Sequence, residues 1–231
     1  IAGNVSLGVS IGLIVGSGAD ETGPTALATT GLLAGIPDQI LGLGGNDTTL
    51  WGVGDGREVI DGGAGVDTAN ITGDATQENF DIYSRAEAIT AGLTGLDPLS
   101  QIAITRTSVG VTSVISELRN VEEIVIAGGG GPDSFTVHGD LNGTGLQTNT
   151  ISITGSTGDD TVDISALTSA HRVVFATNGG HDTIIGTLRP QDVVELVPGL
   201  TIADYASTAN ANGTTTLTHG NDTVTFAALG Q

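Results

Sequence analysis

Acidic residues recur in this chain at the ends of glycine-rich turns, directly before short runs of small and β-branched residues. In the stretch DGGAGVDTAN, residues 61–70, three glycines precede Asp67. Glycine adopts positive φ without steric cost, so such a turn can point its carbonyl oxygens inward. Aspartate adds a carboxylate on a short side chain, and Ca²⁺ prefers about six to eight oxygen ligands of these two kinds. The residue types therefore indicate a turn that supplies part of a calcium site.

The same frame, G-G-x-G-x-D-x-U-x with U a large or aliphatic residue, occurs several times. It fits best at 62–70 and 128–136, and degenerate copies lie at 42–50, 53–61, 155–163, 177–185 and 219–226. In the copy at 53–61 a glutamate, Glu58, takes the aspartate position. The predicted metal-binding residues are Gly45, Asp47, Gly54, Gly56, Glu58, Gly62, Gly63, Gly65, Asp67, Gly128, Gly129, Gly131, Asp133, Gly158, Asp160, Gly180, Asp182, Gly220 and Asp222.

These copies resemble the RTX, or haemolysin-type, calcium-binding repeat. They cover about a quarter of the chain, and the strand-rich blocks between them look like the flanking segments of secreted RTX proteins. The resemblance implies a parallel β-roll, several bound Ca²⁺ ions, and type I secretion from a bacterium. It also implies that a full coil uses two nonapeptides, which places alternate turns on opposite edges.

Spacing predicts how the turns stack. Asp47 and Asp67 are 20 residues apart with Glu58 between them, so the two aspartates should share one edge and Glu58 should lie on the other. Asp133, Asp160 and Asp182 are farther apart. We expect calcium between the 155–160 and 177–182 turns, with the 128–133 and 155–160 turns as a second candidate pair.

Residues 79–126 carry longer predicted strands, in the stretches NFDIYS, QIAITRT, VTSVIS and EEIVIAG. From residue 128 to the end, Gly/Asp turns alternate with short predicted strands, and no convincing 3.6-residue period occurs in the chain. Helix, strand and loop all remain open for 85–95. The expected fold is therefore all-β, a parallel β-roll or β-helix-like solenoid with calcium-binding Gly/Asp turns, over residues 42–231. Aromatic residues make up only 3% of the sequence, so the core must be built mainly from small and branched aliphatic side chains.

Residues 1–41 are expected to form an N-terminal strand and a connector. Apolar and small residues alternate over 4–15, which predicts a long strand. Such a strand could end the sheet of its own chain or pair with a neighbouring subunit, and both readings stay open. Residues 19–39 read as a loop-rich connector with a short helical turn.

The composition excludes or disfavours several classes of binding partner and several kinds of chemistry. The formal net charge is −20, with 6 basic residues against 26 acidic ones, which disfavours nucleic acid and anionic membranes. Cysteine is absent, so thiolate metal sites and thiol catalysis are excluded. Three of the four histidines lie in or beside Gly/Asp turns, where exposed polar residues are expected. A zinc site is therefore less favoured than an ordinary exposed position for these side chains. No nucleophile motif is found, and we expect no enzymatic activity from this chain.

Two functions fit the resemblance. The first is a secreted calcium-binding structural module, such as a surface-layer, adhesin, matrix or filament component, that folds outside the cell and self-assembles through residues 4–15. The second is a calcium-dependent folding and secretion domain of a larger extracellular enzyme whose catalytic part lies upstream. Both place the protein outside the cell or on its surface.

Overall fold

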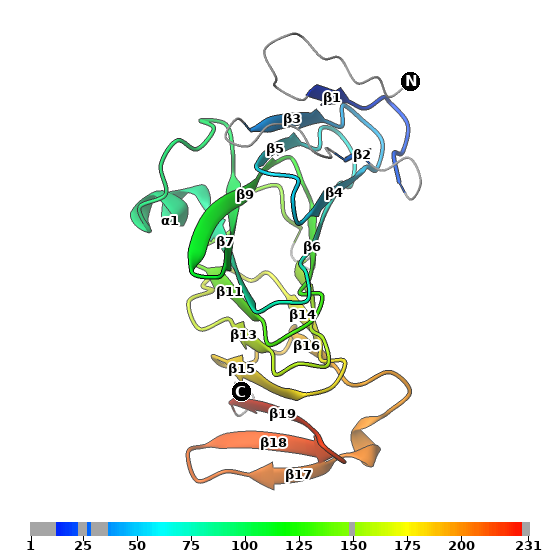
Figure 1. Ribbon diagram of the computed structural model, residues 1–231, viewed down its shortest axis with the longest axis vertical. Coiled ribbons are helices and arrows are strands. Elements are labelled where there is room, and N and C mark those ends of the chain that lie inside the picture. Colours follow the sequence, from blue (N-terminus) through cyan, green and yellow to red (C-terminus); the bar gives the residue numbers. More distant parts are fainter. Residues whose placement is uncertain (1–12, 23–26, 29–36, 148–150, 228–231) are drawn as a thin grey trace.

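The computed structural model describes residues 13–22, 27–28, 37–147 and 151–227, and these form two β-sheets (Figure 1). In spatial order the larger sheet contains β1 (Leu13–Val15), β3 (Asp38–Leu41), β5 (Glu58–Asp61), β9 (Val111–Arg119), β8 (Ile102–Ser108), β7 (Glu78–Ser84), β11 (Ser134–His138), β13 (Thr161–Asp163), β15 (His181–Ile185), β19 (Asp222–Ala227), β18 (Thr214–His219) and β17 (Ala206–Ala209). The smaller sheet contains β16 (Val193–Glu195), β14 (Val173–Ala176), β12 (Ile151–Thr154), β10 (Glu123–Ala127), β6 (Thr68–Thr72), β4 (Thr48–Gly52) and β2 (Leu27–Ala28).

The chain passes back and forth between the two sheets, and most neighbouring strands are parallel. From β3 to β6, successive strands lie alternately in the larger and the smaller sheet. We call the side where the chain leaves the larger sheet the first edge, and the side where it returns the second edge. Turns 42–47 and 62–67 lie on the first edge, whereas turns 128–133 and 155–160 lie on the second.

Apolar side chains from both sheets meet between them in columns. In the smaller sheet Ile71, Ile126, Ile153 and Phe175 are in register on successive parallel strands, and all are at most 2% exposed. In the larger sheet the rings of Phe80 and Phe135 stack with centroids 5.6 Å apart. Side chains alternate between the two faces of a strand, so one apolar residue in two is enough to fill this thin core.

The larger sheet is interrupted by an antiparallel insertion. β6 and β10 pair directly in the smaller sheet, but in the larger sheet β5 and β11 are separated by β9, β8 and β7. β9 pairs with β5 only from Ser116 onward, so residues 111–115 extend past the end of β5 at the second edge. The β8–β9 hairpin therefore protrudes between turns that would otherwise stack.

Helix α1 (Arg85–Thr90) connects β7 to β8, which answers the open question about this segment. The Ser84 side chain accepts a hydrogen bond from the Glu87 backbone N–H and caps the helix. A 3-10 helix, η2 (Ile202–Asp204), precedes the antiparallel strands β17, β18 and β19, which lie at the end of the stack opposite β1 (Figure 1).

The expectation of a β-rich chain with long parallel sheets is confirmed, with the antiparallel insertion and terminal strands as additions. Of the predicted strand 4–15, only residues 13–15 fall within the described part, where they form β1; residues 4–12 lie outside it. Within the described residues, no helix is long and apolar enough to cross a bilayer. The boundary between residues 41 and 42 stays a prediction.

Candidate metal-binding acid ladders

Six-residue turns with an acid at the last position recur along the structure. Five of them begin with glycine and lead from one sheet into the other: GLGGND (42–47), GGAGVD (62–67), GDATQE (73–78), GGGGPD (128–133) and GSTGDD (155–160). GSGADE (16–21) follows the same pattern after β1, and TNGGHD (177–182) follows it with threonine at the first position. Except for Glu21, each final acid lies at or next to the start of a strand, where its carboxylate reaches the adjacent turn.

On the first edge, four acids are connected into what we call the first ladder: Glu21, Asp47, Asp67 and Glu122. The Glu21 N–H donates to Asp47 Oδ1 at 2.9 Å, and the Asp47 N–H donates to Asp67 Oδ1 at 2.8 Å. The Asp67 N–H then donates to Glu122 Oε2 at 2.9 Å. Each carboxylate thus accepts from the backbone of the preceding acid, and the turns are tied together in series.

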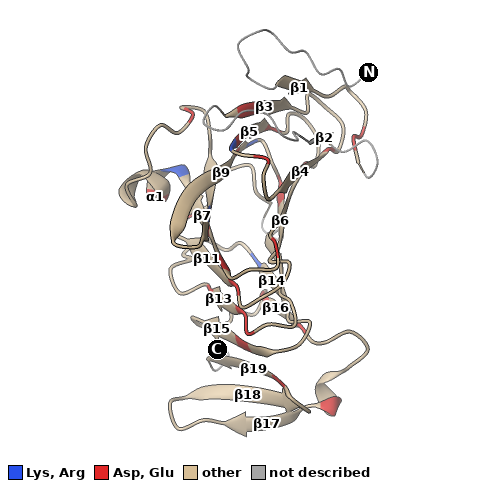
Figure 2. Cartoon of the chain, viewed as in Figure 1, with Lys and Arg blue, Asp and Glu red and all other residues tan. Residues whose placement is uncertain are grey.

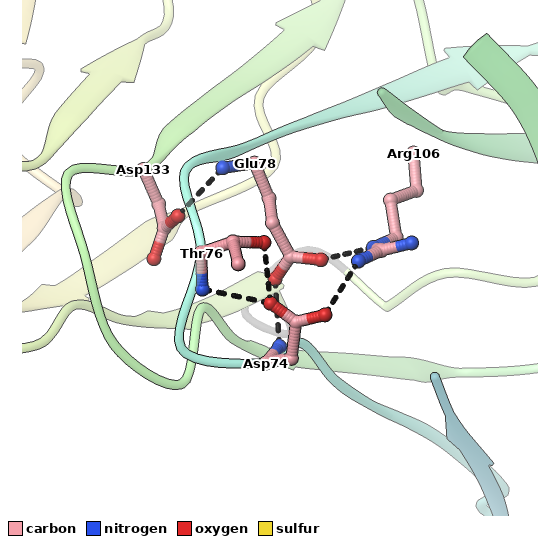
Figure 3. A network of polar contacts seen from close by, with 5 residues as sticks. All are labelled: Asp74, Thr76, Glu78, Arg106 and Asp133. Carbon is pink, nitrogen blue, oxygen red and sulfur yellow. Dashed lines mark hydrogen bonds and ion pairs between the residues drawn. The ribbon is translucent and has the colours of Figure 1, made fainter. Parts of the chain in front are cut away.

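The second edge carries an equivalent second ladder: Glu78, Asp133, Asp160 and Asp182. The Glu78 N–H donates to Asp133 Oδ1 at 2.9 Å (Figure 3), and the Asp133 N–H donates to Asp160 Oδ1 at 2.7 Å. The Asp160 N–H donates to Asp182 Oδ1 at 3.0 Å. Figure 2 shows acidic positions recurring along the stack of turns, with few basic positions beside them.

The second ladder ends on a cation of the chain itself. Arg106, from β8, forms ion pairs with the Glu78 carboxylate and with Asp74, the latter at 3.0 Å (Figure 3). Glu78 also accepts the Asp74 N–H at 2.8 Å through its second oxygen. Both Glu78 oxygens are therefore satisfied, so this end of the ladder needs no further partner.

Four ladder aspartates keep one buried oxygen with no hydrogen-bond partner. These atoms are the Oδ2 oxygens of Asp47, Asp67, Asp133 and Asp182. The residues are at most 2% exposed, so water does not solvate the atoms from outside. A buried carboxylate without compensation is costly, which leaves protonation or a bound cation as the two ways to stabilise it.

In the turns that end at Asp47, Asp67 and Asp133, the opening glycine leaves space beside that oxygen, whereas the turn that ends at Asp182 has Thr177 at this position. A Cβ built on Gly42 would lie 2.6 Å from Asp47 Oδ2, and one on Gly62 would lie 2.7 Å from Asp67 Oδ2. Both would also collide with a carbonyl oxygen of the neighbouring turn, that of Gly62 for Gly42 and that of Asn120 for Gly62. Any side chain would therefore occupy the space where a carboxylate oxygen and a carbonyl oxygen converge.

Burial raises the pKa of the ladder aspartates, and neighbouring carboxylates add to the effect. The pKa of Asp47 rises to about 6, that of Asp133 to about 7, and that of Asp182 to about 8. For Asp133 and Asp182 the nearby charge of Asp160 adds to the shift after burial. Burial also raises the pKa of Asp67 and Asp160. These sites consequently favour a proton or another positive charge over a bare carboxylate.

The donor chemistry fits a hard cation such as Ca²⁺. The available ligands are carboxylate and carbonyl oxygens, without nitrogen or sulfur. Within the described residues, no group of three or more His, Cys, Asp or Glu side chains is arranged to hold a metal ion. A cation on either ladder would therefore take most of its ligands from backbone carbonyls, as a glycine-rich turn allows.

The predicted site residues divide among several places. Asp47 and Asp67 lie on the first edge and Glu58 on the second, which matches the arrangement expected from their spacing. Glu58 is fully buried and is in register with Asp38 and Ser116 on the flanking strands. Of the predicted glycines, nine have positive φ: Gly45, Gly54, Gly56, Gly63, Gly65, Gly129, Gly131, Gly180 and Gly220.

The copy at 219–226 differs from the others. Gly220 lies between β18 and β19, in the turn of an antiparallel hairpin that Asp222 closes by pairing with His219. Asp222 Oδ1 accepts the Gly180 N–H at 3.1 Å. Its partner is therefore not the N–H of Asp182, the acid of the 177–182 turn, but that of the residue two positions earlier. Asp222 therefore contacts the second ladder without extending it by another equivalent step.

Glu21, Glu78 and Glu122 belong to the ladders but were not predicted from the sequence. Two of them follow the frame G-x-x-x-x-E, in GSGADE and GDATQE, so a search that accepted glutamate and only the first glycine would have found them. Glu122 follows β9, at the end of the inserted hairpin, and has no glycine five residues before it. It reaches Asp67 only because β10 pairs with β6.

The histidines make other contacts in the structure. His138 Nε2 lies 2.8 Å from Asp81 Oδ1 and its ring stacks on Tyr83. His181 Nδ1 lies 3.1 Å from Asp159 Oδ1, and His171 bonds Ser169 at 2.9 Å. No family model, curated protein or solved structure matches the chain.

Proposed function

We propose that this protein is a secreted, calcium-stabilised structural module with a β-roll or β-solenoid fold, which completes its folding when Ca²⁺ binds along the two acid ladders. The observation that supports this most is the set of four buried Oδ2 oxygens without a partner, each on an aspartate whose other oxygen accepts a backbone N–H from the adjacent turn. Alternation of the chain between two mainly parallel sheets supports the fold assignment.

Asp47, Asp67, Asp133 and Asp182 would supply the carboxylate ligands, and carbonyls of the opening glycines such as Gly62 would supply others. When bound, Ca²⁺ would provide the positive charge that the chain itself lacks there, since only six basic residues face 26 acidic ones. The chain's own contribution is to fix one oxygen of each carboxylate on a backbone N–H, so that the second oxygen is held ready for a ligand.

Extracellular calcium levels suit such sites. Extracellular calcium modules bind with dissociation constants of about 0.1–1 mM. At about 1 mM free Ca²⁺ such a site stabilises the folded state by about 0.4–1.4 kcal/mol, so four sites together add about 2–6 kcal/mol, a large share of the roughly 5–15 kcal/mol total stability of an ordinary domain. The module would thus fold weakly in a low-calcium cytosol and firmly outside the cell.

Asp133→Asn provides the sharpest test. Asparagine keeps an acceptor for the Glu78 N–H but removes the buried charge and the calcium-binding carboxylate. In EDTA above about pH 7 the variant should be at least as stable as the wild type, because a buried charge is gone. With about 1 mM Ca²⁺ the wild type should gain much more in melting temperature than the variant.

The control is Asp140→Asn, which removes an exposed carboxylate outside both ladders. It should respond to calcium as the wild type does. Equal melting temperatures of the wild type in EDTA and in Ca²⁺, or equal calcium gains in Asp133→Asn and Asp140→Asn, would overturn the proposal. Isothermal titration calorimetry gives the number of sites independently.

A further inference from the structure

The inserted hairpin creates a pocket that regular stacking of the turns would close. β4 and β6 are in register up to Gly52 and Thr72, so the turns that follow them on the second edge start side by side. They lead into β5 and β7, which β8 and β9 hold apart. The protruding residues 111–115 stand in the space between, and a pocket of about 410 Å³ lies between them and turn 53–57.

The pocket has a mixed apolar and polar lining. Trp51, Gly56 and Arg57 line it from one side, and Arg106, Ser113 and Ile115 from the other. Its volume lies within the roughly 300–1,000 Å³ of small-molecule sites. The only tryptophan of the chain is thus held at this place, and its Nε1–H donates to Gly56 O at 2.8 Å.

A β-bulge shapes the hairpin side of the pocket. The register between β8 and β9 shifts between Ile104 and Thr105, which leaves Ile115 as the extra residue of β9. A bulge bends its strand and changes the direction of the neighbouring side chains, and bulges are common beside functional sites. Here the bulge lies between the part of β9 that pairs with β5 and the overhang that carries Ser113.

Buried carboxylates hold both arginines in place. Arg57 donates from Nε and Nη2 to the fully buried Glu117, and from Nη2 to Gly95 O at 2.8 Å. Arg106 donates from Nε to the fully buried Glu78 and from Nη2 to Asp74. Neither guanidinium forms a hydrogen bond through Nη1 within the described residues, and both side chains are partly exposed, by 24% and 15%. Two fixed donor groups therefore remain for a ligand.

The charges around the pocket favour a neutral ligand. Three carboxylates, those of Glu117, Glu78 and Asp74, face the two guanidinium groups, and the molecule as a whole carries −20. The three carboxylates and the negative net charge offset most of the attraction that the guanidinium groups would exert on an anion. A cation in the pocket would be repelled by the two guanidinium groups. Hydroxyl groups can accept from guanidinium, and the apolar face of a sugar ring can lie against aliphatic lining such as Val114, to which Trp51, only 5% exposed, adds a small part.

We propose that this pocket, formed by turn 53–57 and the β8–β9 overhang, binds a neutral saccharide. The test uses the fluorescence of Trp51, the sole tryptophan, in calcium-containing buffer. Titrations with galactose, N-acetylglucosamine, maltose and cellobiose, preceded by a printed array of neutral glycans, should give a saturable change with at least one of them. Galacturonate, the anionic counterpart of galactose, should bind more weakly than galactose.

Two neighbouring residues on opposite faces of β9 supply matched variants. Ser113→Phe fills the pocket and should weaken binding by at least about tenfold. Thr112→Phe, an equally exposed position outside the pocket lining, should leave the affinity within about twofold. No binding to any neutral glycan, stronger binding of galacturonate, or equal loss in the two variants would overturn the proposal. The calcium dependence of the melting temperature is measured separately for both variants. A negative result for saccharide binding therefore does not bear on the proposal that the acid ladders bind calcium.

Discussion

At the scale of single residues, the first and last positions of each turn depend on each other. The acid at the sixth position folds back over the glycine at the first, so that a Cβ at Gly42 or Gly155 would lie 2.6 Å from the carboxylate of Asp47 or Asp160. Gly42 does not have positive φ, so it is required for space and not for backbone conformation. This distinguishes it from Gly45 of the same turn, which has positive φ.

Gly42→Ala should therefore destabilise the protein, by about 1–3 kcal/mol from overpacking, and weaken its response to calcium. The new methyl group would meet the Gly62 carbonyl and the Asp47 carboxylate, neither of which can move without breaking a contact between turns. Urea denaturation in EDTA and in Ca²⁺ measures both effects.

Gly18→Ala is the matched control, since Gly18 is exposed, lacks positive φ, and would place a new Cβ with nothing within 4 Å of it. It should change stability by less than about 0.5 kcal/mol. A Gly42→Ala variant as stable as Gly18→Ala would show that the carboxylate can leave the glycine without cost.

At the scale of elements, the sequence predicted strands and turns but gave no indication of the antiparallel insertion formed by β7, β8 and β9. Alternating apolar residues placed most strands correctly, and the 20-residue spacing of Asp47 and Asp67 predicted that they stack. The antiparallel path of β8 could not be predicted, because a strand in either direction shows the same alternation. The pairing of β6 with β10, which brings Glu122 to Asp67, depends on that path.

The β8–β9 insertion contacts the second ladder through the pairing of β8 with β7, which begins at Glu78, and through the ion pair between Arg106 and Glu78. Arg106→Met would leave Glu78, whose side chain is fully buried, without its cation, at a cost of about 3–5 kcal/mol. Arg119→Met breaks the partly exposed pair with Asp61 and should cost less than about 1 kcal/mol. Denaturation midpoints of the two variants compare the costs directly.

If Arg106→Met fails to fold, the double variant Arg106→Met/Glu78→Leu decides the matter. Removing both charges should recover most of the loss, because the cost comes from the unpaired carboxylate and not from the missing arginine. A double variant as unstable as Arg106→Met alone would indicate that Arg106 stabilises the hairpin by packing.

At the scale of the whole molecule, the two ladders concentrate negative charge in the interior of a chain that is already strongly acidic. The pKa values of Asp47, Asp133 and Asp182 are about 6, 7 and 8, against an ordinary value of 3.8. The folded chain therefore binds protons more tightly than the unfolded chain at these positions. Protons and calcium ions compete for the same oxygens, so the two should stabilise the molecule in opposite pH ranges.

Metal-free protein should become more stable as the pH falls from about 8 to about 4. The sign follows because these folded-state pKa values exceed the unfolded ones, so each site takes up a proton on folding within that range. Below about pH 4 the trend should reverse, as Asp74, Asp159 and Asp204, whose pKa values are lowered mainly by hydrogen bonds to their side chains, lose that stabilisation. In Ca²⁺ the trend above about pH 5 should invert, with stability rising with pH.

Urea midpoints measured between about pH 4 and 8.5, in EDTA and in Ca²⁺, test this directly. Asp182→Asn should flatten the metal-free profile most between about pH 6 and 8, because it removes the group with the highest of these pKa values. Asp140→Asn removes one exposed charge and should leave the slope nearly unchanged, which separates the buried ladder from general repulsion in a chain of net charge −20. Metal-free protein that is more stable at pH 8.5 than at pH 5 would mean that the ladder carboxylates are already stabilised as anions by the fold alone.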